Sequence, residues 1–186
     1  MNFNGSYELN SNIYKVWENL NNPEVLKECI DGCSEFLSTD NSEYKAKINI
    51  KLGPVNAFFN SKIKITNIKQ FEGYEIQATG NAGNLGFASG NVKVLLQEVN
   101  NKTILKYEAE SRVNGKLAQL GSRLIDGSVK KNTEKFFNNF RKTLIESNTT
   151  IIDKDKNTKL SNSYTKVFSF MFIVLILILV FLGVYA

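Results

Sequence analysis

Two cysteines are the residues of this sequence best suited to nucleophilic or metal chemistry. Cys29 and Cys33 are its only thiols, and its 186 residues include no histidine. Without histidine, a Ser-His or Cys-His pair, a histidine general base and the usual histidine-containing zinc sites are all excluded. Two thiols cannot complete a structural zinc site, so we predict small buried cysteines and no metal site. Catalysis by carboxylates alone stays open, although no pair of acidic residues is placed to suggest it.

The glycine-containing segment 86–90 is the other candidate for chemistry. Its sequence, GFASG, could begin a phosphate-binding loop. Such a loop requires Gly-Lys-Ser or Gly-Lys-Thr at the start of a helix, whereas the residues that follow here alternate as in a strand. We therefore predict a turn or bulge at this segment, and no catalytic residue in the chain.

The distribution of charge argues against nucleic-acid binding. The chain has 23 Lys and Arg against 18 Asp and Glu, a net charge of +5, and no basic run is longer than Lys130-Lys131. Nucleic-acid binding requires a denser basic stripe. We expect solvated lysines, a mild attraction to anionic lipid and no charged binding site.

Alternation of apolar and polar residues marks the strands that must position any site. Residues 44–52 alternate apolar side chains with lysine and asparagine, which predicts a half-buried strand. Two short helices are predicted near residues 13–20 and 23–30. The same alternation, interrupted by Gly, Pro and Asn, predicts further strands near residues 3–9, 34–39, 55–65, 74–78, 92–96 and 105–113.

One long helix is predicted from residue 116 to about 146. Leu117, Leu120 and Leu124 share a helical face, and the later apolar residues follow a rotated line, so we expect a bend at the small residues that begin with Gly121. This helix must cover the apolar face of the sheet, which predicts an α+β fold with a curved antiparallel sheet around it. Small residues on the facing surfaces permit a cavity without requiring one: Ala57, Ser61, Ala78, Ala109, Ser111, Gly121 and Ser128.

The C-terminal segment 167–186 is predicted to be a transmembrane tail anchor. It has no charge, and as a helix its twenty residues would span about 30 Å, the thickness of the bilayer hydrocarbon. A buried core helix would need a partner surface that is apolar all round. We predict a ligand-binding domain at 1–146 and a flexible polar linker at 147–166. The lysine-rich linker and the absence of a signal peptide at the N-terminus predict a single-pass protein of the cell membrane with a cytoplasmic soluble domain.

Four sequence blocks, taken together in order, carry a resemblance to a known family. The blocks are PEVLKECIDGC at 23–33, LGPVNAFF at 52–59, GFASG at 86–90 and GKLAQLGSRLIDG at 115–127. They resemble the family of the carbon monoxide dehydrogenase G subunit, in the START-like (SRPBCC, helix-grip) superfamily. The resemblance implies a helix-grip domain with a hydrophobic cavity between the sheet and the long helix. It also implies a membrane-recruitment factor for molybdenum-containing carbon monoxide dehydrogenase and related hydroxylases, with a quinone or other isoprenoid lipid in the cavity.

The favoured hypothesis is a non-enzymatic, membrane-tethered adaptor that binds a hydrophobic ligand and docks an oxidoreductase. One alternative is an enzyme of the polyketide cyclase or dehydrase type, which would place polar catalytic groups in the same cavity. Another is a lipid carrier without a redox partner. The residues predicted to line the cavity are Leu117, Leu120 and Leu124 on the helix, Phe59 and Ile63 on the sheet, and Phe87 or Ile30 near a mouth.

Overall fold

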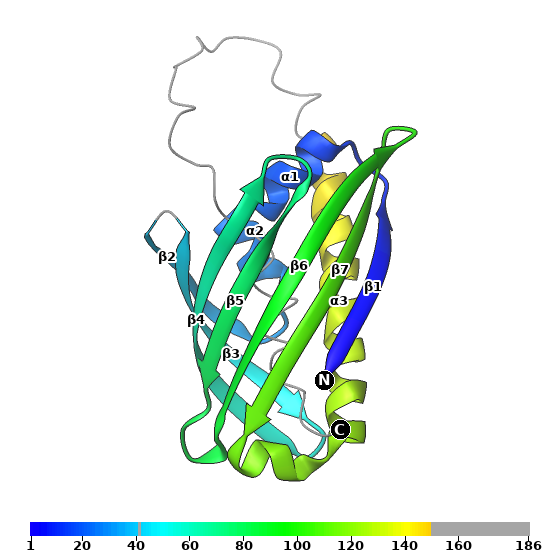
Figure 1. Cartoon of the computed structure of the whole chain (residues 1–186). Coiled ribbons are helices and arrows are strands. Elements are labelled where there is room, and N and C mark those ends of the chain that lie inside the picture. The colour runs from blue at the N-terminus through cyan, green and yellow to red at the C-terminus, as the bar shows by residue number, and fades with distance from the viewer. Residues whose placement is uncertain (41, 150–186) are drawn as a thin grey trace.

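One antiparallel sheet dominates the computed structural model, which describes residues 1–40 and 42–149 (Figure 1). Its seven strands follow the order β1-β7-β6-β5-β4-β3-β2, so the first and last strands in the sequence lie side by side. All the predicted strands are present, which confirms the antiparallel sheet. The strands are β1 (Asn2–Leu9), β2 (Cys33–Asp40), β3 (Glu43–Leu52), β4 (Val55–Lys69), β5 (Gly73–Asn81), β6 (Phe87–Val99) and β7 (Lys102–Asn114).

The period-two pattern of the strands separates a buried face from an exposed one. Along β3, every second residue from Tyr44 to Leu52 is buried, and the residues between them are exposed. The antiparallel register then sets inward residues of adjacent strands opposite one another, as with Ala46 and Ser61. The sheet curves around the helices on its buried side (Figure 1).

Two short helices close one end of the curved sheet. In α1 (Ile13–Leu20) the side chain of Asn12 accepts a hydrogen bond from the Lys15 amide at 2.9 Å. In α2 (Pro23–Cys29) the side chain of Asn22 accepts from the Glu24 amide at 2.9 Å, and Pro23 occupies the first turn. Both caps satisfy amide groups that a helix start leaves without a partner.

The long C-terminal helix begins later than the sequence suggests. Gly115–Leu120 form a short 3-10 helix, η2, and α3 runs from Ser122 to Thr149. Gly121 between them has φ 81° and ψ 148°, which no α-helix accommodates. The prediction of one bent helix from residue 116 is therefore wrong, because the chain breaks at Gly121. Leu117 is buried while Leu124 is 44% exposed, so these leucines do not share a helical face.

Aromatic residues of α3 form the middle of the core. Phe136, Phe137 and Phe140 are at most 1% exposed. The Phe137 ring stacks on Tyr7 of β1 with 3.6 Å between ring centroids, which joins the helix to the edge of the sheet. The helix α3 packs most closely on α1, α2 and β3. Large helix side chains therefore span the distance to the middle of the sheet.

Most of the predicted linker and the whole predicted anchor lie outside the described residues. The linker was placed at 147–166, and its first residues, 147–149, belong to α3. The anchor was placed at 167–186. Within residues 1–40 and 42–149, no helix combines the length and the hydrophobicity that a bilayer crossing requires.

Candidate ligand-binding site

Two adjacent rows of small side chains cross the buried face of the sheet. The successive partners are Ala46, Ser61, Gly80 and Ala88 in the first row, and Ala78, Gly90 and Ser111 in the second. We call these the small-residue rows. Side chains of this size recess the inner wall of a sheet that is already concave, opposite the helix that covers it.

Three buried hydroxyl groups on this interior have no hydrogen-bond partner. Ser61 and Ser111 belong to the small-residue rows, and Thr133 lies on α3. Their residues are 3%, 2% and 2% exposed, respectively. A buried hydroxyl left without a partner costs about 1–3 kcal/mol, and most such groups in native proteins are paired. These hydroxyls are suited to a bound molecule that carries neutral oxygen acceptors.

The buried interior is free of formal charge. Among residues 1–40 and 42–145, the buried side chains with polar groups are those of serine, threonine, tyrosine, tryptophan and cysteine, and no Asp, Glu, Lys or Arg is buried. Taking an ion out of water without a counter-ion costs far more than taking out a neutral group. The interior therefore favours a neutral guest over a carboxylate or a phosphate.

A groove of about 740 Å³ lies between the edge strand β1 and the first half of α3. Phe3, Tyr7, Tyr107 and Val129 contribute its apolar and aromatic surface, and Thr133 is one of its lining residues. The groove therefore reaches the residue that carries one of the partnerless hydroxyls, although the Oγ1 atom is itself buried. Its rim carries charges of both signs, from Asp126, Lys130 and Glu134.

Two phenols in this groove stay protonated at physiological pH. Burial raises the pKa of Tyr107 to about 12. Burial also raises the pKa of Tyr7, and the Glu134 carboxylate adds to this effect. The Tyr107 ring lies where a Cβ of Gly5 would be, so glycine at this position of β1 allows the ring to sit against the strand. The groove thus presents neutral rings with hydroxyl groups.

The structure disperses the seven residues predicted to line the cavity. Leu120 is half-buried, Phe87 at the start of β6 is 54% exposed, and Leu124 lies on the opposite side of α3 from the groove, against Gly53. None of the seven lines the groove between β1 and α3. Four of them belong to the buried core: Ile30, Phe59, Ile63 and Leu117.

Sequence reasoning did not single out Thr133 or Tyr107 as lining a site. For Thr133 a signal was present: it lies four residues after Val129 and four before Phe137, both buried. A lone polar residue in phase with a buried helical stripe indicates a hydroxyl directed into the core. The groove at Tyr107 depends on how β1 returns to pair with β7, which no local pattern reveals.

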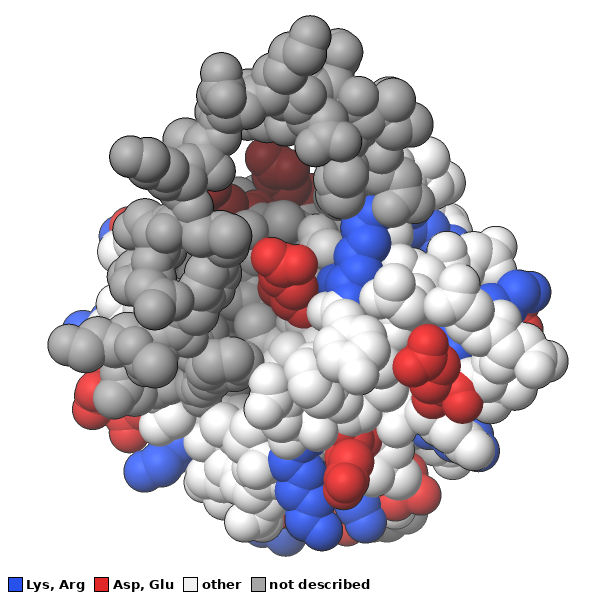
Figure 2. Space-filling model, turned by 90° about the horizontal axis from the view of Figure 1, so that it is seen from above, with Lys and Arg blue, Asp and Glu red and all other residues white. Residues whose placement is uncertain are grey.

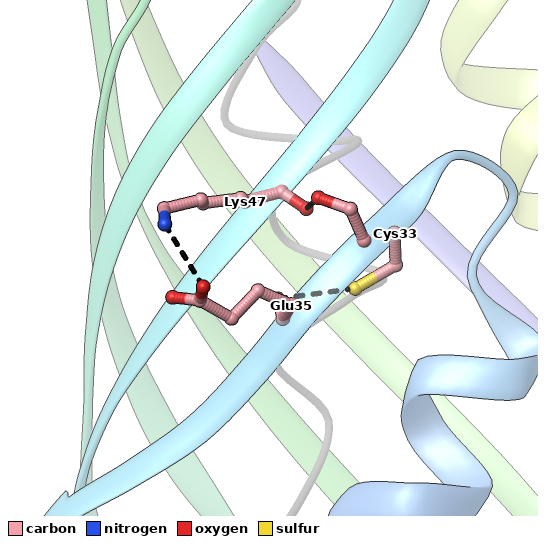
Figure 3. Close-up of polar contacts among 4 residues, drawn as sticks. Cys33, Glu35 and Lys47 are labelled. Carbon is pink, nitrogen blue, oxygen red and sulfur yellow. Dashed lines mark hydrogen bonds and ion pairs between the residues drawn. The ribbon is translucent and has the colours of Figure 1, made fainter.

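The two cysteines make structural contacts. Burial raises the pKa of Cys29 to about 12 and that of Cys33 to about 11, so both remain thiols at neutral pH. The Cys33 thiol donates to the Glu35 carbonyl at 3.4 Å, and Glu35 pairs with Lys47 at 2.8 Å (Figure 3). The ion pair joins β2 to β3, and the thiol contact lies within β2 where the register shifts between Cys33 and Glu35.

Alkaline pH is expected to destabilise the fold, whereas the range from pH 6 to 8 is not. The ordinary pKa values of Cys29 and Tyr107 are 9.0 and 10.0, and both are raised to about 12 in the folded chain. Their contribution to the free energy of unfolding is complete below the unfolded-state pKa and is lost as pH rises towards 12. Urea denaturation at successive pH values measures this decline, and Tyr107→Phe should make it shallower. A decline already at pH 6 to 8 would contradict the assignment.

The sheet, the long C-terminal helix and the groove between them identify the structural class of this protein. A curved antiparallel sheet closed by one long C-terminal helix is the helix-grip fold of START-like proteins, a fold suited to ligand binding. Over residues 5–145 the sequence matches the family described as the G subunit of carbon monoxide dehydrogenase (CoxG), and the chain belongs to this family. No curated protein matches the chain.

Solved structures support the fold. A conserved protein from Geobacillus kaustophilus is 30% identical, with a TM-score of 0.75, and the match covers 79% of this chain and 97% of that one. The Zhui aromatase/cyclase of Streptomyces sp. R1128 is 10% identical, with a TM-score of 0.55 and coverage of 78% and 94%. The protein TTHA0849 from Thermus thermophilus is 7% identical, with a TM-score of 0.60 and coverage of 79% and 99%. The latter two similarities concern the fold alone.

Proposed function

We propose that this chain is a non-enzymatic adaptor that binds a neutral hydrophobic ligand, an isoprenoid quinone, and recruits a molybdenum hydroxylase of the carbon monoxide dehydrogenase type to the membrane. The ligand class is inferred from the partnerless hydroxyls of Ser61, Ser111 and Thr133. They lie in an interior where none of the described Asp, Glu, Lys or Arg side chains is buried. A quinone has two carbonyl acceptors on a neutral ring and a long apolar chain. A fatty acid or phospholipid would bring an anion that no buried cation neutralises in the described part of the chain.

The partner and the location rest on other observations. The family is described by its association with carbon monoxide dehydrogenase, which supports a complex with that class of enzyme. The uncharged segment 167–186 supports a tail anchor with the domain on the cytoplasmic side. A non-enzymatic role is supported by the buried residues, because those described include no Asp, Glu, Lys or Arg that could act as a buried general acid or base. Co-purification of the full chain with the hydroxylase from host membranes tests the recruitment.

Lipid extraction from the purified full chain tests the ligand. The chain is isolated from a quinone-producing host, extracted with solvent and analysed by mass spectrometry, with quinone expressed per mole of protein. The control is Ala88→Leu, which places a larger side chain in the first small-residue row and should lose the quinone while keeping the same circular dichroism. Equal quinone in both samples would indicate carry-over in detergent. Phospholipid alone would favour the lipid carrier, and turnover of a polyketide by a ligand-free chain would favour the enzyme.

Removal of the partnerless Thr133 hydroxyl should increase the stability of the ligand-free chain and decrease its affinity for quinone. Thr133→Val keeps the shape of the side chain and removes the buried Oγ1. The ligand-free chain should gain about 1 kcal/mol in free energy of unfolding, because a desolvated hydroxyl is lost, and quinone affinity should fall roughly tenfold. Urea denaturation and fluorescence titration with a short-chain quinone measure the two quantities. Thr143→Val is the matched control on the same helix, because the Thr143 hydroxyl already donates to the Phe140 carbonyl at 2.8 Å. If Thr133→Val leaves affinity unchanged, the hydroxyl does not contact the ligand.

A further inference from the structure

The end of the domain opposite α1 and α2 concentrates positive charge. It is built from the β3–β4 turn, the β5–β6 turn with its short 3-10 helix η1 (Gly83–Leu85), the end of β7, η2 and the first turns of α3 (Figure 1). We call it the η1–η2 end and define it as residues 51–56, 82–88 and 112–131. These ranges contain one acidic residue, Asp126, and six basic residues: Lys51, Arg112, Lys116, Arg123, Lys130 and Lys131. Their net charge of +5 equals that of the whole chain.

These cations are available to a partner. All six basic residues are exposed. None of them is in an ion pair with another residue in the parts of the chain that the structure describes. Lys51, Arg123 and Lys131 line a common hollow of about 550 Å³ between the β3–β4 turn and α3, and the acidic residue in its lining, Asp31, is paired with Lys135. Figure 2 shows the opposite end, where both acidic and basic side chains are scattered among uncharged ones.

Apolar side chains project among these cations. Phe87 is 54% exposed and Leu124 is 44% exposed. Phe87 pairs with Asn114, two residues before Lys116, and Leu124 follows Arg123 directly. Large apolar groups surrounded by cations, with few anions, match the boundary between anionic head groups and acyl chains of a bilayer. An acidic protein surface would match the charge but would not require the exposed phenylalanine and leucine.

We propose that the η1–η2 end docks on the surface of an anionic bilayer, with Phe87 and Leu124 at the level of the head groups and the six cations on anionic lipids. The docked end contains the start of α3, so the groove between β1 and α3 opens close to the lipid. The proposal concerns the outer surface of the domain, and it holds whichever ligand the interior binds.

Chain length is compatible with this orientation. The 28 residues of α3 place its C-terminal end about 42 Å from the η1–η2 end. Seventeen residues, 150–166, separate Thr149 from the predicted anchor, and an extended chain of that length reaches roughly 60 Å. A chain that leaves α3 at the far end can therefore return to the same bilayer.

Tryptophan quenching by brominated phospholipids in vesicles tests which end of the full chain meets the bilayer. Trp17 is the only tryptophan, so Trp17→Phe provides a background for one reporter at a time. Phe87→Trp reports the η1–η2 end, and Tyr14→Trp, at a residue 64% exposed on α1, reports the opposite end. If Trp17→Phe impairs folding, the reporter tryptophans are introduced into the chain that keeps Trp17. The quenching measured for Trp17 alone is then subtracted from that of each reporter variant. We expect quenching of Phe87→Trp with phosphatidylglycerol vesicles, and much less with neutral vesicles or at high salt.

Charge neutralisation supplies the second measurement. Lys51→Gln, Lys116→Gln and Arg123→Gln together should reduce the docking equilibrium constant roughly 100-fold, since each cation contributes about fivefold. The matched control is the triple variant Lys62→Gln, Lys69→Gln and Lys106→Gln, which changes net charge equally at exposed positions outside the η1–η2 end and should leave docking within about twofold. Stronger quenching of Tyr14→Trp than of Phe87→Trp would overturn the proposal. Equal quenching of Phe87→Trp with neutral and anionic vesicles, or equal effects of the two triple variants, would also contradict it. Absence of quenching with either lipid would contradict it too, and would favour an acidic protein as the partner.

Discussion

Replacing Gly86 by alanine should lower the free energy of unfolding by roughly 3 kcal/mol or more, one of the largest effects expected from a single methyl group in this chain. Gly86 has φ 124°, and a Cβ there would overlap the carbonyl oxygen of Asn114. The neighbouring Gly115 faces Gly86 backbone to backbone, so neither segment can retreat without moving the other. The contact fixes η1 against η2 where β6 begins and β7 ends. Urea denaturation followed by circular dichroism measures the loss.

Gly83→Ala is the matched control, because Gly83 lies three residues earlier and also has a positive φ, of 61°. A Cβ at Gly83 would meet no atom within 4 Å. Its cost should therefore be confined to the left-handed backbone, about 1–2 kcal/mol. Equal losses for the two variants would show that conformational strain alone, and not the close approach of Gly86 to Asn114, determines the effect.

Phe137→Ala should destabilise the domain by about 3–5 kcal/mol. The Phe137 side chain is fully buried, stacks on Tyr7 of β1 and meets Phe136 edge-on at 5.3 Å between centroids. Its removal leaves a cavity and also detaches α3 from the edge strand, so amide hydrogen exchange in β1 should accelerate more than in β4. Denaturation and exchange monitored by mass spectrometry measure the two effects.

Ile145→Ala provides the comparison on the same helix. Ile145 is 67% exposed, so its truncation should change the free energy of unfolding by no more than about 0.5 kcal/mol. A uniform rise in exchange across the sheet in Phe137→Ala would mean that Phe137 stabilises the core as a whole and does not specifically attach β1.

The strands, the helix caps and the family were determined by the sequence, because each depends on neighbouring residues or on the order of motifs. Alternation from Tyr44 to Leu52 places one face of β3 in the core whatever its partners are. Asn22 and Pro23 start α2 through contacts within a few residues. Four blocks along the chain were sufficient to identify the CoxG family, which the match over 5–145 confirms.

The break in the last helix was decided by the tertiary structure. Gly121 and Gly127 both interrupt the helical pattern, and either could have bent it or ended it. Gly121 has a positive φ and separates η2 from α3, while Gly127 remains within α3. Leu117, four residues before Gly121, is buried in the core, whereas Gly127 on α3 is exposed.

Site and surface also follow from tertiary structure. Ser61 and Ser111 are 50 residues apart and face one interior only because the four strands from β4 to β7 pair in this register. Lys51 lies far in sequence from Arg123 and Lys131, so the sequence shows no cluster of basic residues. The three side chains line one hollow because the β3–β4 turn lies beside α3 in the folded chain. Pairing register and sheet curvature add up over the whole chain, so no local pattern contains them.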